Sequence, residues 1–478
     1  MTKKIVGDFE LTDLYDLKTD EYEKIENEYY YEGEREYTLE EYYEQIVGDL
    51  QPGEKFVATW YTGNSEEVTI PEGVFGIGEK LFFKNETLKK INMPSSVQKI
   101  YDWAFFVCPA LEEVNLSENI DEIGMYAFCE CTRLKKMSFP GSVRTLGDNI
   151  LRNCNSLEEV IFNEGMKVIP KALFGRKNEL IKKVVIPDSV ETIDWNAFEG
   201  CSALEEVTFG KNVKVIEVSA FSECKSLKSV SLPESLEEIG LTAFSECDLT
   251  EVYIPKNVKE LGWLVFDKNP NFKELVISPD NPYFYVRNNC IFNKSDNVLI
   301  GAASNYKIPD DGSVKIIGRA AFHRDTSIVD LRLPEGLEII AARAFDECKN
   351  MRSATLPNTL KTICSTAFGD CPGLTEITIP GSVEIVENGA FFRAGLRKVV
   401  FKRGVLTVED DAFRSCRFLK EVYIPSSVSF PDDDNPFYEC NKSLKIYIEE
   451  SDKEKQNKLL KSLKKFNVKF IKRSKIFD

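Results

Sequence analysis

Residues 227–248 read LKSVSLPESLEEIGLTAFSECD, and residues 374–395 read LTEITIPGSVEIVENGAFFRAG. Both follow the pattern L-x-x-[VI]-x-[IL]-P-x-[SG]-[VL]-x-x-[IV]-x-x-x-A-F. The closing phenylalanine, or a leucine in its place, recurs about every 23 residues. It falls at Phe82, Phe105, Phe128, Leu151, Phe174, Phe198, Phe221, Phe244 and Phe266, and then at Phe322, Phe345, Phe368, Phe391, Phe413 and Phe437. Such spacing predicts a solenoid in which each repeat is one coil.

Each part of the repeat has a physical role. Apolar residues alternate with polar ones in segments such as Leu111 to Leu116, which predicts a short half-buried strand. Stacked coils join these strands into one parallel sheet. The proline that often follows has no N–H for a ladder and ends the strand. We expect Ala-Phe to begin a short helical or 3-10 turn, with the phenylalanine inside.

Cysteine recurs three residues after the phenylalanine position. A small side chain with a weak donor, replaced by asparagine in two coils, predicts an inward row that satisfies backbone carbonyls of adjacent coils. Metal binding and disulfides between adjacent coils are the alternatives. The row contains Cys108, Cys131, Cys154, Cys201, Cys224, Cys247, Cys348, Cys371, Cys416 and Cys440.

The full unit, seen from Cys224 to Phe244, resembles the BspA-like class of leucine-rich repeat. The resemblance covers roughly residues 66–448. It implies a leucine-rich-repeat solenoid, a right-handed curved coil of about 14–15 repeats with its parallel sheet on the concave face and the turns opposite. It also implies a role in adhesion or protein recognition.

Solenoid ends need caps. Residues 1–65 contain an acidic, tyrosine-rich segment and a predicted N-terminal cap, in which Thr38 and Glu41 begin a helix and a strand follows over 56–61. Residues 449–478 predict a second cap, with Ser451 and Glu454 beginning a helix and a strand over 468–471. Residues 279–306 interrupt the repeat and predict a hairpin around 293–297, which either continues the sheet or projects as a binding element.

The composition limits the functional classes. The net charge of −17 argues against binding to nucleic acid or acidic membranes. No stretch is long and apolar enough to span a membrane or to serve as a secretory signal, so the chain as written is expected to be cytoplasmic; a trimmed mature form would be secreted or on the cell surface. We expect a monomer without cofactors.

No catalytic motif is evident, and we expect no enzymatic activity. The only histidine, His323, is interpreted as a turn residue and no metal site is expected. Asp432, Asp433 and Asp434 with Asn435 could offer oxygen ligands to a cation, but they lack the spacing of a calcium loop.

The residues that flank the central strand valine form rows on the expected concave face. We expect these rows to bind a protein partner, with an adhesin and a structural spacer as alternatives. Tyr253, Arg332 and Tyr423 are the favoured contacts, because aromatic and arginine side chains combine contact area with a polar group. The other candidate residues are Glu206, Glu251, Glu274, Asp330 and Glu376.

Overall fold

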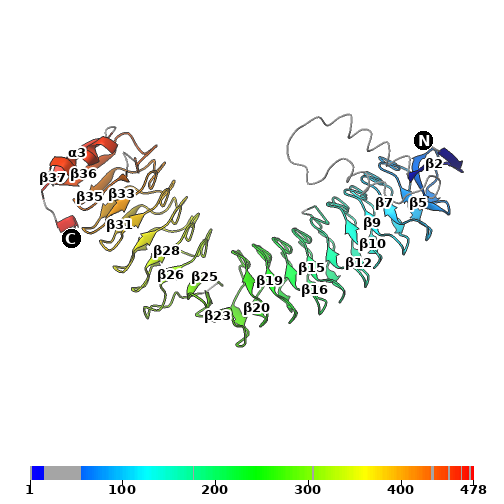
Figure 1. Ribbon diagram of the computed structural model, residues 1–478, viewed down its shortest axis with the longest axis horizontal. Coiled ribbons are helices and arrows are strands. Elements are labelled where there is room, and N and C mark those ends of the chain that lie inside the picture. The colour runs from blue at the N-terminus through cyan, green and yellow to red at the C-terminus, as the bar shows by residue number, and fades with distance from the viewer. Residues whose placement is uncertain are drawn as a thin grey trace, which may run out of the picture. The chain divides into compact units, whose positions relative to one another are not determined.

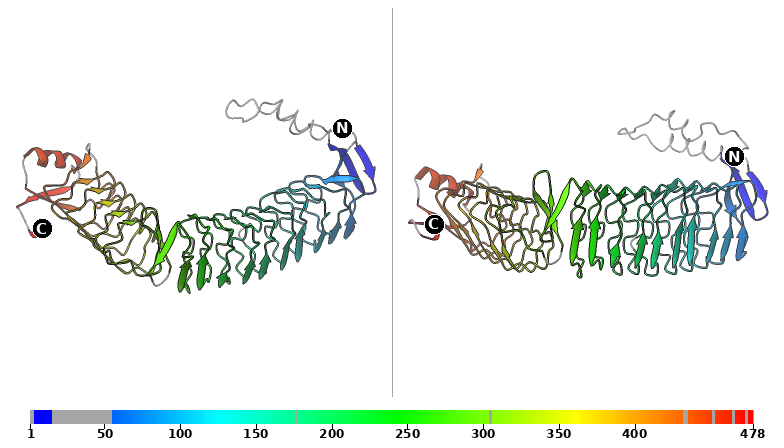
Figure 2. Two further views of the ribbon diagram at one scale, coloured as in Figure 1. Left: turned by 60° about the horizontal axis from the view of Figure 1, so that its bottom comes forward. Right: turned by 90° about the horizontal axis from the view of Figure 1, so that it is seen from below.

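The computed structural model describes residues 3–14, 55–175, 177–303, 306–431, 435–450, 453–463, 466–472 and 475–477. The chain forms two compact units, Met1–Leu249 and Thr250–Asp478, and each is described by itself. Within each unit the coils are stacked in sequence order (Figure 1). Figure 2 shows the same stacking from two further directions. Most coils contribute one longer and one shorter strand to two separate parallel rows.

The row of longer strands is the sheet expected from the sequence. In β16 the outer residues Glu206 and Thr208 are exposed and Val207 is buried, as the alternation predicts. Pairing of β14 with β16 joins residues 23 positions apart, such as Lys183 and Glu206. In the first unit the longer strands are β4 (Glu67–Thr69), β6 (Lys90–Asn92), β8 (Glu113–Asn115), β10 (Lys136–Phe139), β12 (Glu159–Phe162), β14 (Lys183–Val185), β16 (Glu206–Thr208) and β18 (Ser229–Val230).

The same row in the second unit continues beyond the last repeat. Its final strand, β37, lies in the predicted C-terminal cap and still pairs in parallel with β36. The row is therefore longer than the 14–15 repeats expected. The strands are β20 (Glu251–Ile254), β22 (Glu274–Ile277), β27 (Asp330–Arg332), β29 (Ser353–Thr355), β31 (Glu376–Ile379), β33 (Lys398–Phe401), β35 (Glu421–Ile424), β36 (Lys445–Glu449) and β37 (Asn467–Ile471).

The row of shorter strands was not expected from the sequence. Most of its strands have only two residues, of which the second is buried in most coils, as in Glu122–Ile123. In the first unit they are β5 (Val74–Ile77), β7 (Lys99–Ile100), β9 (Glu122–Ile123), β11 (Thr145–Leu146), β13 (Val168–Ile169), β15 (Thr192–Ile193), β17 (Val215–Ile216) and β19 (Glu238–Ile239). In the second they are β21 (Glu260–Leu261), β26 (Ile316–Ile317), β28 (Ile339–Ile340), β30 (Thr362–Ile363), β32 (Ile385–Val386) and β34 (Thr407–Val408).

The phenylalanine positions form the core, as predicted. Rings from successive coils stack in the second unit at centroid distances of 5.3 Å for Phe345–Phe368 and for Phe368–Phe391. Stacked rings occur in the first unit too, as in Phe105–Phe128 at 4.9 Å. Phe266 is the exception among these positions, because it is only partly buried. One coil cannot bury such a ring alone, so the stacking holds the coils together.

The Ala-Phe segment is not the helical or 3-10 turn that we expect from the sequence. Residues two before and two after the phenylalanine have left-handed backbones, as in Tyr126 (φ 54°) and Glu130 (φ 61°) around Phe128. A helix needs negative φ throughout, so it cannot form here. Inter-coil bonds stabilise this conformation, because Tyr126 N–H donates to Asp148 O at 3.0 Å and Glu130 N–H to Arg152 O at 2.8 Å.

The cysteine row has the predicted role. Cys108 Sγ donates to Phe82 O at 3.1 Å, and Cys371 Sγ to Phe345 O at 3.2 Å, each reaching a carbonyl of the preceding coil. All 13 cysteines are free thiols, so the disulfide alternative is wrong. Burial raises the pKa of Cys371 to about 12, which keeps the thiol protonated as a donor.

Replacing Cys371 with alanine is expected to lower the free energy of unfolding by about 1–3 kcal/mol, because the buried Phe345 carbonyl loses its donor. Cys371→Ser keeps a hydroxyl donor and should lose less. Urea denaturation followed by circular dichroism compares the two variants. If both variants are equally destabilised, packing of the sulfur rather than its hydrogen bond explains why cysteine recurs at this position of the repeat.

The N-terminal end begins with a hairpin that the sequence did not reveal. Strands β1 (Lys3–Val6) and β2 (Phe9–Asp13) pair antiparallel, and β2 pairs antiparallel with β3 (Phe56–Tyr61). Strand β3 has the bounds predicted from the sequence and continues in parallel with β5. The predicted helix that begins at Thr38 lies outside the described residues.

The C-terminal end contains the predicted helix and strand. Helix α3 (Lys453–Ser462) buries Leu459, and the nearby Leu463 is also buried. Strand β37 follows, and a short 3-10 segment, η2 (Lys475–Phe477), ends the described chain. Ser451 of the predicted capping box and the aspartates 432–434 lie outside the described residues.

The interruption of the repeat forms two linked hairpins. The predicted turn at 293–297 joins β24 (Cys290–Asn293) to β25 (Val298–Ala302). A further strand, β23 (Phe284–Arg287), pairs with β24 through a tight turn in which Asn288 and Asn289 have φ of 51° and 58°. Strand β25 pairs in parallel with β26, so the insertion continues the row of shorter strands.

Candidate functional site

The structure places all eight predicted contact residues on the outward side of the longer strands. Acidic candidates occupy the first position of their strands, and Tyr253, Arg332 and Tyr423 occupy the third. All are exposed except Tyr423, which is half-buried. The first-position acids are Glu206 on β16, Glu251 on β20, Glu274 on β22, Asp330 on β27 and Glu376 on β31.

Part of this surface is internally charge-paired. Lys183 Nζ lies 2.7 Å from Glu206 Oε1, and Lys136 Nζ lies 3.0 Å from Glu159 Oε2. These pairs join adjacent coils at exposed positions, where each contributes little to stability. Glu206 therefore has a charge partner on the adjacent coil.

Tyr423 is also engaged by neighbours. Its ring stacks on Tyr447 at 4.8 Å, and Lys398 Nζ lies 5.7 Å from its ring centroid. Burial raises the pKa of Tyr423 above its usual range. This aromatic pair offers a flat surface rather than a single projecting side chain.

The three favoured contacts do not form one patch. Tyr253 lies on β20, which pairs with β22. Arg332 lies on β27, in a two-stranded sheet with β29, and Tyr423 lies on β35, in the sheet that begins with β31. Arg332 and Tyr423 are four strands apart, which at about 4.8 Å per strand is roughly 19 Å. Tyr253 lies beside the exposed Val276 of β22 instead.

A groove of about 700 Å³ runs beside β27 and contains two of the predicted residues. It is lined by Asp330, Arg332 and their neighbours on one side, and by residues 306–308 and 310 on the other. Tyr306 is partly buried against the core, with its ring tilted against that of Phe322 at a centroid distance of 4.9 Å and its hydroxyl donating to Asp325.

The edge of β27 that faces the groove has no backbone partner among the residues that the structure describes. On its other edge Leu333 N–H donates to Thr355 O at 3.1 Å, in the ladder with β29. Among the described residues, no backbone hydrogen bond joins β27 to residues 306–308. Arg332 has no ion pair within the described ranges, whereas Asp330 accepts a bond from Ser353 Oγ at 2.6 Å.

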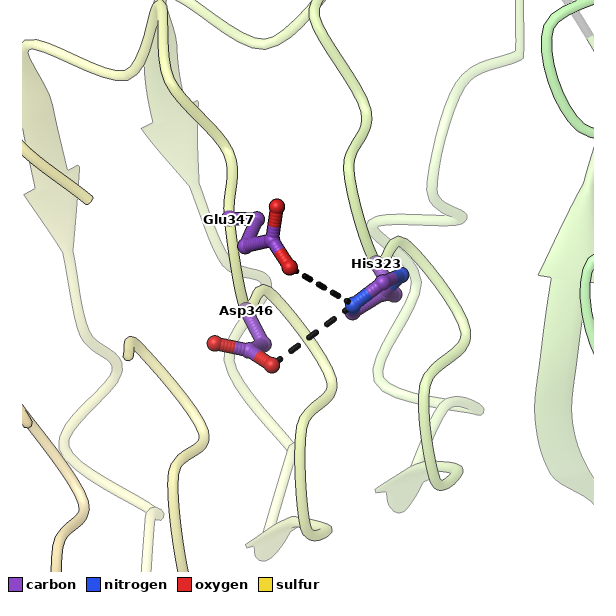
Figure 3. A group of neighbouring side chains, drawn as sticks. All are labelled: His323, Asp346 and Glu347. Atoms are coloured by element: carbon purple, nitrogen blue, oxygen red, sulfur yellow. Dashed lines mark ion pairs between the residues drawn. The ribbon is translucent and has the colours of Figure 1, made fainter. Parts of the chain in front are cut away.

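A second group of side chains gathers on the turns of the second unit (Figure 3). His323 follows Phe322 in a turn, as expected, and Asp346 and Glu347 follow Phe345 in the next coil. His323 Nε2 lies 3.6 Å from Asp346 Oδ2 and 3.7 Å from Glu347 Oε1. The side chains of His323 and Asp346 are only 12% and 8% exposed.

Electrostatics keep this group in defined charge states. Burial lowers the pKa of His323, and the neighbouring arginine Arg324 lowers it further. Burial raises the pKa of Asp346, whereas a hydrogen bond from Arg324 lowers that of Glu347. At neutral pH the imidazole is therefore neutral.

The sequence prediction missed this group because it did not compare equivalent positions outside the consensus. His323 and Asp346 each follow a core phenylalanine and are 23 residues apart, so the repeat itself places them side by side. The next residue at this position is Gly369, where a Cβ atom would lie 2.6 Å from Asp346 Oδ1. The missing side chain leaves room for the buried carboxylate.

Comparison with solved structures finds bacterial leucine-rich-repeat proteins. A leucine-rich cell surface protein of Faecalibacterium prausnitzii is 22% identical, with 96% of this chain and 97% of that chain covered and a TM-score of 0.47. A leucine-rich repeat protein of Bacteroides ovatus is 20% identical, with 89% and 97% covered and a TM-score of 0.42. A search of curated protein sequences gives no match.

No helix in the described ranges is long and apolar enough to cross a bilayer. The model of the BspA type leucine-rich repeat region matches residues 58–181, 174–273 and 315–445, which together make up most of the chain. These ranges contain the stacked phenylalanines, the cysteine row and most of both rows of strands. The chain therefore belongs to the BspA-type leucine-rich-repeat family.

Proposed function

We propose that the chain recognises a protein partner, and that the groove beside β27 receives an extended segment of that partner. The observation that carries this proposal is the groove-facing edge of β27. Unpaired N–H and C=O groups on a strand edge are a template for another chain, and strand addition is a common mode of peptide recognition. Within the described ranges these groups of β27 have no strand partner on this edge, and β27 lines the groove.

The side chains of the groove suggest the chemistry of the bound segment. Arg332 is exposed and has no ion pair among the described residues, and Val329 beside it is 41% exposed. Lys307, across the groove, is already paired with Asp310 at 3.1 Å. The best complement is an extended peptide with a carboxylate that reaches Arg332 and an apolar residue over Val329.

The rest of the outward face would widen the contact. Tyr253 with Val276, and Tyr423 with Tyr447, are apolar surfaces on the same row of longer strands in the second unit. Binding of a folded partner on the face that we expect to be concave would use these pairs in addition to the groove. If this partner were a matrix protein, the chain would act as an adhesin, which is the alternative function.

Replacing Arg332 with glutamate is expected to weaken peptide binding tenfold or more, because an attractive charge becomes repulsive. The probe is a peptide selected from a random displayed library on the full chain, with affinity measured by fluorescence anisotropy. Arg352→Glu, an exposed arginine outside the groove lining, is the matched control and should bind as well as the parent.

Strand addition also requires free backbone N–H groups on the peptide, which can be tested independently of its side chains. N-methylation of alternate backbone amides should abolish binding, because the peptide can no longer pair with the β27 edge. Selected peptides without acidic residues, or with equal affinity for Arg332→Glu, would contradict the groove. Loss of binding in a Tyr253→Ala, Tyr423→Ala variant instead would place the contact elsewhere on the outward face.

A further inference from the structure

We propose that His323, Asp346 and Glu347 form a binding site for a divalent transition-metal ion of the Zn²⁺ type. One nitrogen and two carboxylate oxygens from adjacent coils of the second unit point toward one another, within 4.8 Å (Figure 3). The site is separate from the outward face of the longer strands, so it goes beyond the proposed function and does not depend on it.

The distances fit a metal better than they fit direct bonds. His323 Nε2 is 3.6 Å and 3.7 Å from the two carboxylate oxygens, which is beyond normal hydrogen-bond length. In a tetrahedral site with metal–ligand bonds of about 2.0–2.1 Å, two ligand atoms lie roughly 3.4 Å apart. The two distances from His323 therefore need shifts of only a few tenths of an ångström. The carboxylate oxygens, which lie within 4.8 Å of each other, approach by up to roughly 1.4 Å through rotation of the Asp346 and Glu347 side chains.

The donor set selects the class of ion. Imidazole and carboxylate together suit Zn²⁺ and related transition metals, whereas Ca²⁺ and Mg²⁺ prefer oxygen ligands alone. His323 Nδ1 is buried and has no hydrogen-bond partner among the described residues. The ring can keep its proton on Nδ1, which leaves the lone pair of Nε2 for the metal. Three protein ligands leave the fourth position for water.

Two arginines compete with the metal and tune the site. Arg324 Nη2 donates to Glu347 Oε1 at 3.0 Å, and Arg343 Nε lies 3.6 Å from Asp346 Oδ2. On metal binding, the second oxygen of each carboxylate can keep the arginine as an outer partner. The arginines thus hold the carboxylates in place and make the site weaker than a closed site with four ligands.

Buried packing supports a fixed geometry. Asp346 is 6% exposed, and the absent side chain of Gly369 leaves space for its Oδ1. The coils that carry the ligands are joined by backbone bonds at the turns, including Phe322 N–H to Ala344 O at 2.8 Å and Arg324 N–H to Asp346 O at 2.8 Å. Ligands on such a rigid frame are already near the positions that binding requires.

Isothermal titration of the full chain with Zn²⁺, in the presence of excess Ca²⁺ and Mg²⁺, tests the site. We expect one high-affinity ion per chain that His323→Gln and Asp346→Asn weaken at least tenfold, while Asp370→Asn, a partly buried acid of the next coil, does not. The expected rise of Tm with Zn²⁺ should disappear in the same variants. Circular dichroism confirms that each variant is folded.

Removal of a competitor gives a test that a purely structural ion-pair group would fail. Arg324→Gln frees Glu347 Oε1 and should tighten Zn²⁺ binding several-fold. No measurable binding to the parent chain overturns the proposal. Binding that survives His323→Gln also overturns it, because the ion is then held elsewhere, for example by thiols. Weaker binding in Arg324→Gln would show that the arginine supports a ligand rather than competing with the ion.

Discussion

Replacing Phe368 with alanine is expected to lower the free energy of unfolding of the second unit by about 3–5 kcal/mol. The ring is fully buried and stacks on Phe345 and Phe391, so its loss leaves a cavity and removes contacts with two coils at once. Urea denaturation followed by circular dichroism measures the change.

Phe418→Ala is the matched control for this experiment. Its side chain is 63% exposed, so the substitution should change stability by less than about 0.5 kcal/mol. Equal effects of the two substitutions would mean that the stacked rings do not hold the coils together. A loss confined to one part of the denaturation curve would show that coils unfold in groups.

Replacing Glu449 with glutamine is expected to cost about 2–3 kcal/mol, because it removes the buried negative charge that accepts two hydrogen bonds from Arg403. Glu449 lies on β36 and is 4% exposed. Its Oε1 accepts bonds from Arg403 Nε and Nη2, and its Oε2 accepts bonds from Ser426 N–H and Oγ. One carboxylate thus joins three successive coils.

The effect of this substitution should depend on pH. Burial raises the pKa of Glu449, but the bonds from Arg403 and Ser426 outweigh it and bring the pKa below its usual range. The unfolded carboxyl titrates near pH 4.3, so the stabilisation is complete above that pH and is lost as the pH falls through the lower folded pKa. The melting temperatures of parent and variant should therefore differ clearly at pH 7 and only slightly at pH 3. The exposed Glu450→Gln is the control, and its melting temperature should stay close to that of the parent at both pH values.

The repeat spacing was enough to predict the core from the sequence. Residues such as Phe128 and Phe345 must be inside, because nothing else recurs with the same period and the same size. The role of the cysteine row was predicted from its position in the repeat, because a thiol that asparagine replaces in two coils indicates a hydrogen-bond acceptor nearby. The alternation around Val207 predicted the longer strands for the same reason.

Other parts of the fold left no local signal. A strand such as Glu122–Ile123 is too short to show alternation, and it exists only because the next coil pairs with it. The left-handed backbones of Tyr126 and Glu130 are imposed by bonds to the following coil rather than by residue type. Strands β1 and β2 join the sheet only by pairing of β2 with β3, and 42 residues separate these two strands in the sequence.

The candidate sites were predicted only in part. Outward positions such as Arg332 follow from strand alternation, but whether an edge of β27 has a backbone partner depends on the neighbouring coil and leaves no local signal in the sequence. Asp346 and Glu347 were missed because they differ from the consensus, although His323 stands at the equivalent position of the preceding coil. Comparison of each position down all the repeats would have revealed this pair.

The thiol-to-carbonyl contacts also set how the molecule can change in length. Nearly all thiols of the row donate to a carbonyl of the preceding coil, as Cys371 does to Phe345. Duplicating or excising one complete 23-residue block therefore recreates the same junction, with every donor again facing an acceptor. Recombination can lengthen or shorten the protein in steps of about 5 Å without redesign of the interior. Adding or removing a block of a different length would move the thiols out of register with their carbonyls.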